Sequence, residues 1–379
     1  MAGMADATAT TVFLSGDVMP SRGVDQILPH PGDPSLRESY VTDARRYVDL
    51  AEAANGPIPY PVEFAWPWGD SLPALDAIAP DVRVINLESS ITADGEFAPG
   101  KAVHYRMNPD NIGCLTAARP DVCALANNHV LDFGRRGLID TLDALRGAGL
   151  CGAGAGVDIE QARRPAIVTS RGGCRVLIFA CGMASSGIPA DWAATADRPG
   201  ICYLPDGSDR EASALAGQVR AVKRPGEVVI VSVHWGANWG YQVTRDQVEF
   251  GHLLIDAGVD IVHGHSSHHP RPIEIYHDRL VLYGCGDLID DYEGVGGYER
   301  FRDDLRLLYF VSVRPDTGAL VSLRMVPVQA RNLRLRRASA ADAAWLRGTL
   351  ERISRSFGTR LVLGSDGVLT VGRARATRS

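Results

Sequence analysis

Five polar residues of metal-binding types follow short apolar runs in this sequence: Asp17, Glu88, Asn128, His234 and His265. Each falls just past the carboxyl end of a predicted buried strand, the edge at which open α/β sheets bind ligands. Carboxylate, amide and imidazole donors without sulfur suit Mn²⁺, Fe, Zn²⁺, Ni²⁺ or Co²⁺ better than a Cys-based structural zinc site does. Their shared position predicts a site for one or two divalent metal ions.

Two further histidines lie close to this set. The segment Gly264-His265-Ser-Ser-His268 puts two imidazoles on one short loop, and His129 directly follows Asn128. Taken singly, each residue has an ordinary structural interpretation, because a histidine after a strand is usually hydrogen-bonded and an Asp after Gly usually forms a turn. The coincidence of five such residues at strand ends favours the functional interpretation.

Four basic side chains are candidates for binding substrate. Arg22 lies just beyond Asp17, and Lys101, His104 and Arg106 share one short segment. Alternation along an extended segment places His104 and Arg106 on one face. Arginine binds phosphate or carboxylate in a bidentate manner, so this face could clamp an anionic substrate. A solvated basic edge is the competing interpretation.

Strands and helices alternate along the chain, which predicts a layered α/β domain with mixed sheets. Residues 28–72 are mixed in character and read as an insertion over one face, and residues 151–157 read as a Gly-rich turn. Apolar runs predict strands at 10–15, 82–87, 122–126, 166–170, 175–181, 227–233, 259–263, 272–276, 280–283, 305–313 and 320–328. Helical patterns cover 38–53, 109–119, 136–148, 210–223, 246–257 and 338–356.

Composition limits the classes of function. The chain has 379 residues and a formal charge of −6, which argues against non-specific binding to nucleic acid or to an anionic membrane. Its seven cysteines form no C-x-x-C pair and mostly lie in apolar runs, so we expect reduced, buried thiols and a reducing compartment. We find no signal peptide and no run of about 18 apolar residues. These features predict a soluble cytoplasmic protein with no stable membrane insertion.

Several ordered motifs resemble the CapA family, named for poly-γ-glutamate capsule synthesis, which is itself similar to the calcineurin-like metallophosphatases. The match runs from about residue 10 to about residue 315. It rests on Gly16-Asp17-Val-Met19-Pro-Ser-Arg22, Asn86-Leu87-Glu88, Leu125-Ala-Asn127-Asn128-His129-Val-Leu-Asp132-Phe-Gly134, Val233-His234-Trp235-Gly236, Gly264-His265-Ser-Ser-His268 and Tyr283-Gly-Cys-Gly286-Asp287.

The resemblance implies an α/β fold, a four-layer αββα sandwich of the metallophosphatase type with mixed sheets. We expect this domain to cover residues 1–335. Residues 336–379 would add a C-terminal helix, short strands and a tail, of which residues 373–379 are expected to be frayed.

The resemblance also implies roles for individual residues. It makes Asp17 a metal ligand, Glu88 a metal-bridging carboxylate and Asn128 a ligand. It makes His129 an acid or a transition-state contact, so that Asp17, Glu88 and His129 are the expected catalytic residues. The remaining implied metal ligands are His234, His265 and His268.

One residue departs from the phosphatase pattern. Met19 occupies the histidine position of the D-x-H motif. The first metal would therefore lose a nitrogen ligand, so that it binds weakly or the site works with one metal, unless Asp132 or Asp287 completes a two-metal site.

The function that these features predict is that of a soluble metal-dependent hydrolase acting on a phosphoester. A bound divalent ion polarises a substrate oxygen and activates water for such a reaction. One alternative is an accessory protein of poly-γ-glutamate biosynthesis or export, and another is metal-dependent cleavage or transfer at a γ-glutamyl amide. The expected partner is thus a small-molecule substrate, either phosphorylated or γ-glutamyl.

Overall fold

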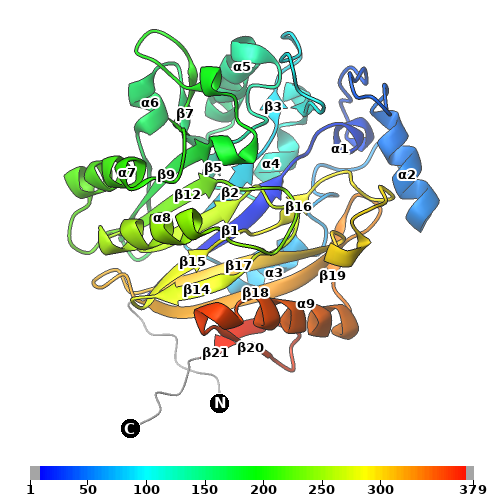
Figure 1. Ribbon diagram of the computed structural model, residues 1–379. Coiled ribbons are helices and arrows are strands. Elements are labelled where there is room, and N and C mark those ends of the chain that lie inside the picture. Colours follow the sequence, from blue (N-terminus) through cyan, green and yellow to red (C-terminus); the bar gives the residue numbers. More distant parts are fainter. Residues whose placement is uncertain (1–8, 373–379) are drawn as a thin grey trace.

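The computed structural model describes residues 9–372, and two mixed β-sheets pack face to face at its centre (Figure 1). The first sheet has the order β20-β21-β18-β17-β1-β2-β5-β6, with β16 beside β1 and β19 beside β18. Its strands are β1 Thr10–Val18, β2 Val82–Leu87, β5 Val122–Ala124, β6 Cys151–Ala153, β16 Asp287–Ile289, β17 Leu305–Val313, β18 Leu320–Ala330, β19 Leu335–Arg337, β20 Arg360–Leu363 and β21 Leu369–Gly372.

The second sheet has the order β11-β9-β12-β13-β15-β14, with β8 beside β9. Its strands are β8 Ala166–Thr169, β9 Arg175–Met183, β11 Tyr203–Leu204, β12 Val228–His234, β13 Ile261–His265, β14 Ile273–Tyr276 and β15 Arg279–Leu282. Two small two-stranded sheets pair β3 Ser90–Ile91 with β4 Arg106–Met107, and β7 Ala155–Gly156 with β10 Gly200–Ile201.

Side-chain alternation along β12 shows how the layers form. Val229, Val231 and Val233 pack into a core with helices α7 and α8, whereas Val228 and Ile230 join the core shared with the first sheet. Successive side chains of a strand point to opposite faces, so a strand that is covered on both faces is apolar throughout. This explains the unbroken apolar run of β12.

The connections β1–β2–β5–β6 are parallel and progress in one direction across the first sheet. Because parallel crossovers are right-handed, their helices α3, α4 and α5 lie on one face, opposite the second sheet. The result is the predicted four-layer αββα arrangement, with α7 and α8 as the other outer layer (Figure 1). The helices are α1 Gly23–Ile27, α2 Arg45–Asn55, α3 Ser71–Ile78, α4 Gly113–Ala117, α5 Gly134–Gly147, α6 Ile159–Arg163, α7 Asp209–Val222, α8 Arg245–Asp256 and α9 Ala340–Ile353.

Most predicted elements are confirmed, and those at 82–87 and 305–313 match β2 and β17 residue for residue. The Gly-rich turn predicted at 151–157 is wrong, because this segment forms β6 and β7. A Cβ at Gly152 would lie 2.9 Å from Leu125, and one at Gly154 would lie 2.7 Å from Ala180. Gly152 therefore allows close packing of β6, and Gly154, with a φ of 88°, forms the bend between β6 and β7.

The helix predicted from residue 38 begins only at Arg45. Residues 35–43 instead turn back on themselves through a bridge between Ser35 and Asp43. Glu38 is buried there against Arg22, so its charge is satisfied by an ion pair and not by solvent on a helix surface.

The C-terminal part of the described chain continues the first sheet, because β21 pairs with β18 and β20 pairs with β21. The domain boundary near residue 335 stays a prediction. The tail expected at residues 373–379 lies outside the described residues. Between residues 9 and 372, none of the helices has both the length and the apolar character needed to span a bilayer.

Candidate metal centre

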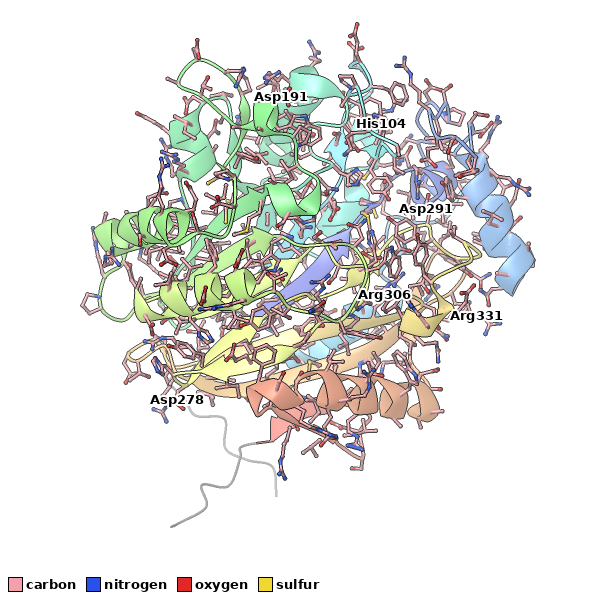
Figure 2. The ribbon with its side chains drawn as sticks, viewed as in Figure 1. His104, Asp191, Asp278, Asp291, Arg306 and Arg331 are labelled. Carbon is pink, nitrogen blue, oxygen red and sulfur yellow. The ribbon has the colours of Figure 1, made fainter. Side chains whose placement is uncertain are left out.

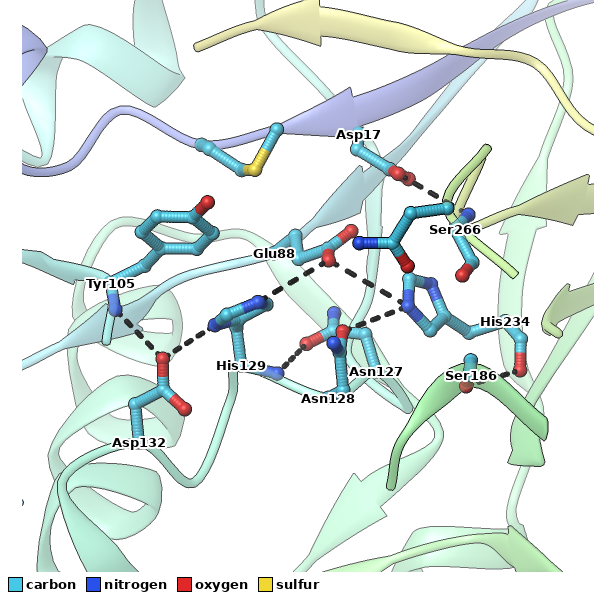
Figure 3. Close-up of polar contacts among 12 residues, drawn as sticks. Asp17, Glu88, Tyr105, Asn127, Asn128, His129, Asp132, Ser186, His234 and Ser266 are labelled. Atoms are coloured by element: carbon cyan, nitrogen blue, oxygen red, sulfur yellow. Dashed lines mark hydrogen bonds and ion pairs between the residues drawn. The ribbon is translucent and has the colours of Figure 1, made fainter. Parts of the chain in front are cut away.

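Parallel strands of both sheets end at one place, and their carboxyl ends carry the predicted ligands (Figure 3). Asp17 lies near the end of β1, and His234 and His265 end β12 and β13, where they are register partners. The first sheet supplies the candidate carboxylates and the Asn128 amide. The second sheet supplies the candidate imidazole ligands. The centre is thus built at the edge where the two sheets meet.

Asp17 is fully buried and held by directed hydrogen bonds. The Asn86 amide Nδ2 donates to Asp17 Oδ1 at 2.7 Å and to Glu88 Oε2 at 3.0 Å. The Ser266 backbone N–H donates to Asp17 Oδ2 at 3.2 Å. Asn86 therefore fixes two candidate ligands at once. Sequence reasoning missed it, although Asn86 and Glu88 are two residues apart along one strand direction and so share a face.

Two groups of side chains could each hold a cation, and Asp17 belongs to both. One group is Asp17, His234 and His265, and the other is Asp17, His268 and Asp287. Within each group one ligand atom per residue lies within 4.8 Å of the others. Oxygen and imidazole donors of this kind suit divalent transition metals.

The two strand-end histidines face each other directly. His234 Nδ1 lies 2.8 Å from His265 Nδ1, and His234 Nε2 lies 2.9 Å from Asn128 Oδ1. The Ser232 hydroxyl lies 2.8 Å from His265 Nε2 and anchors that ring. Burial lowers the pKa of both imidazoles well below the usual value. Both rings are therefore neutral, the form that binds metal ions.

The carboxylates of the site repel one another. Burial, followed by the charge of Asp287, raises the pKa of Asp17 to about 7. Burial and the neighbouring Asp17 raise the pKa of Glu88 well above its usual value. A cation would relieve this repulsion and supply the counter-charge that the buried acids lack. The residues present thus fit a divalent metal ion.

His268 and Asp287 form an ion pair beside Asp17, with His268 Nδ1 at 2.9 Å from Asp287 Oδ1. Burial lowers the pKa of His268, but the charges of Asp287 and Asp17 outweigh it and raise that pKa overall. Asp287 is the register partner of Asp17 across β1 and β16. Prediction from the sequence identified Asp287 only as an alternative ligand. The strand β16 that carries it is only three residues long and has no clear apolar pattern.

His129 lies next to the candidate ligands without belonging to either group. Its Nδ1 lies 2.6 Å from Asp132 Oδ2, and its Nε2 lies 3.9 Å from Glu88 Oε1 (Figure 3). The Tyr105 backbone N–H donates to the same Asp132 oxygen at 2.7 Å. Burial lowers the pKa of His129 to about 4, against the opposing effect of Asp132.

Of the four predicted substrate-binding residues, the structure brings Lys101 to the centre. The Lys101 ammonium donates to the Asn128 carbonyl and to Asp132 Oδ1, and lies 3.3 Å from His129 Nδ1. Its charge is therefore already paired within the site. Substrate contact by Lys101 stays a prediction.

The other three lie away from the two ligand groups, around a small pocket beside Phe133. Arg22 is buried and donates to Glu38 and Asp291. His104 Nε2 donates to the Ala98 carbonyl at 2.8 Å, and Arg106 pairs with Asp33 at 3.4 Å. Figure 2 shows His104 and Asp291 on the side of the molecule that carries α1 and α2. A cavity of about 590 Å³, lined by residues of β14, β18 and β21, contains none of the predicted ligands.

Comparison with known proteins adds an independent observation. Residues 11–292 match the family described as "Bacterial capsule synthesis protein PGA_cap". A "probable polyglutamine synthesis accessory protein" of Mycobacterium tuberculosis is 57% identical over 372 residues, covering 98% of this chain and 97% of that protein. The "PGA biosynthesis protein CapA" of Bacillus subtilis is 28% identical over 61% of this chain and 58% of its own length.

Among solved structures, a phosphatase from Mycoplasma pneumoniae aligns with 85% of this chain and 94% of its own. The TM-score is 0.47 and the sequence identity 9%.

Proposed function

Because this chain belongs to the bacterial capsule synthesis protein family PGA_cap, we propose that its buried centre is that of a divalent-metal-dependent hydrolase acting on a phosphoester. The observation that carries the proposal is the pair of ligand groups that share Asp17. Two adjacent cation sites with a neutral histidine beside them suit in-line attack on a phosphorus centre.

Asp17, Glu88, Asn128, His234 and His265 would hold one ion. Asp17, His268 and Asp287 would hold a second. A bound divalent ion supplies Lewis-acid polarisation of the substrate oxygens.

His129 has the geometry of a proton carrier. Since Asp132 is an acceptor, the neutral imidazole donates its Nδ1–H to that carboxylate and keeps a lone pair on Nε2. Nε2 faces Glu88 and the candidate ligands, so it would accept the proton of the attacking water and return it to the leaving oxygen. Asp132 selects this tautomer by accepting the Nδ1–H, and Lys101 fixes Asp132 through its other carboxylate oxygen.

A second candidate function rests on the relatives. The Mycobacterium tuberculosis protein that shares 57% of its residues with this chain is named as an accessory protein of polyglutamine synthesis. We propose an accessory role in polyglutamate synthesis as the alternative, with cleavage or transfer at a γ-glutamyl amide as the reaction of the same centre. A metal that stabilises a phosphoryl oxyanion stabilises the tetrahedral oxyanion of an amide as well.

The deciding experiment combines metal analysis of the purified protein with a substrate screen of phosphomonoesters, phosphodiesters and γ-glutamyl amides. His265→Ala is the test variant, and we expect a strong loss of metal content together with loss of turnover, because the change removes a neutral nitrogen donor. His252→Ala is the matched control, because His252 is a partly exposed histidine that pairs with Glu274 outside both ligand groups.

Turnover confined to γ-glutamyl amides would replace the phosphoester proposal by the alternative. Full metal occupancy in His265→Ala would overturn the ligand assignment.

A further inference from the structure

Two tyrosines in contact with each other link His129 to His268. The Tyr105 ring lies against His129 with ring centroids 4.1 Å apart, and the Tyr292 ring meets His268 edge-on at 5.1 Å. Their hydroxyls contact each other. Figure 3 shows Tyr105 beside His129, with its hydroxyl directed away from Asp132.

The hydroxyls of this pair are incompletely satisfied. Their mutual contact uses one of the two phenol protons, because one hydroxyl donates and the other accepts. The remaining proton is directed from Tyr292 to the Met19 sulfur at 3.9 Å. A thioether is a weak acceptor, so this donor would gain from a better oxygen partner.

The pair is held rigidly and stays protonated. The Arg22 guanidinium lies 4.7 Å from the Tyr105 ring centre and 5.8 Å from that of Tyr292. Arg22 is fixed in turn by Asp291, the residue before Tyr292. Burial raises the pKa of both phenols well above the usual value, so both remain hydrogen-bond donors at neutral pH.

We propose that Tyr292 donates its hydroxyl hydrogen bond to a non-bridging oxygen of the bound phosphoryl group, with Tyr105 as the residue that positions it. The substrate oxygen takes the place of the Met19 sulfur as acceptor. This inference rests on the proposed function and adds a neutral donor to it. The donor matters because the Arg22 and Lys101 charges are already paired with carboxylates.

The test measures the affinity of inorganic phosphate for protein loaded with Mn²⁺, by isothermal titration calorimetry. Tyr292→Phe keeps the ring and removes only the donor. We expect about 10- to 100-fold weaker phosphate binding, the usual effect of losing one hydrogen bond to a charged group. Tyr105→Phe should have a smaller effect of the same sign, because it removes only the group that orients the donor.

Tyr298→Phe is the matched control, since this exposed tyrosine stacks on Trp239 in the same loop region. It should bind phosphate as the wild type does. Metal content and melting temperature should be equal in all variants.

Unchanged phosphate affinity in Tyr292→Phe, or loss of metal from it, would overturn this assignment alone. Failure of wild-type protein to bind phosphate at all would overturn both this assignment and the phosphoester proposal.

Discussion

His129 and Asp132 form a close pair at 2.6 Å, and the opposite nitrogen of the same imidazole faces Glu88 at 3.9 Å. One ring thus connects a structural carboxylate to the candidate metal centre. Asp132 is also held by Lys101, at its other carboxylate oxygen, and by the Tyr105 backbone N–H, at the same oxygen that His129 contacts. The orientation of the imidazole is therefore determined before any ligand arrives.

His129→Asn tests this orientation. We expect turnover to fall by about 10²–10⁴-fold, the usual contribution of a positioned acid–base group, because an amide cannot carry the proton. Metal content, measured by mass spectrometry of the purified variant, should not change. If metal is lost with the imidazole, His129 is a ligand and not a proton carrier.

Asp287→Asn tests whether the centre holds two ions. Asp287 completes the second ligand group without any contribution from Met19, so we expect wild-type protein to bind two ions and the variant to bind one. Titration with Mn²⁺ measures both stoichiometries. Met19→His serves as the comparison and should leave the stoichiometry at two. One ion in the wild type and two in Met19→His would show that Asp287 does not replace the missing histidine.

Metal binding should depend on pH in a defined direction. The pKa of Asp17 is raised from 3.8 to about 7, so in metal-free protein its contribution to stability is present below pH 3.8 and is lost as pH rises through about 7. A metal must displace the Asp17 proton below pH 7, which weakens its affinity by about 10- to 30-fold at about pH 5.5 relative to pH 8. Calorimetric titration at both pH values measures this ratio. Affinity that is independent of pH would show that Asp17 is not a ligand.

Arg22→Met distinguishes a structural role from substrate contact. It leaves Glu38 and Asp291 buried without their partner, which costs about 3–5 kcal/mol of unfolding free energy. Denaturant titration measures the loss, and adding Glu38→Gln and Asp291→Asn should restore much of it. A triple variant that is stable and keeps wild-type phosphate affinity would show that Arg22 does not contact the substrate, contrary to the sequence-based prediction.

Local patterns predicted the fold well where burial alone decides the structure. β2 and β17 are buried strands whose apolar runs begin and end with the strand. The prediction was wrong at residues 151–157, because glycine favours turns locally and only the close approach of Leu125 to Gly152 shows why a glycine is needed in β6. That contact comes from distant parts of the chain, so no local pattern carries it.

The residues of the candidate centre were also predicted in part from the sequence. Asp17, Glu88, Asn128, His234 and His265 do converge, because they end parallel strands, and strand ends are readable in sequence. The sequence did not identify Asn86 as a residue that holds the ligands or Asp287 as a main ligand. Both act through Asp17, which lies on a neighbouring strand. Arg22 is a basic residue near Asp17 in sequence, but Glu38 and Asp291 neutralise it from segments that the local sequence does not indicate.

The division of the centre between two sheets has a mechanical consequence. Since carboxylates come from one sheet and ligand imidazoles from the other, the spacing of the ligands is set by how closely the sheets pack. Val84 and Ile230 belong to the core that fills this space. Cores are packed as densely as crystals and transmit small volume changes. Substitutions at such positions would therefore change the distances between the proposed ligands, and with them the ion radius that the proposed centre would favour, without replacing a ligand.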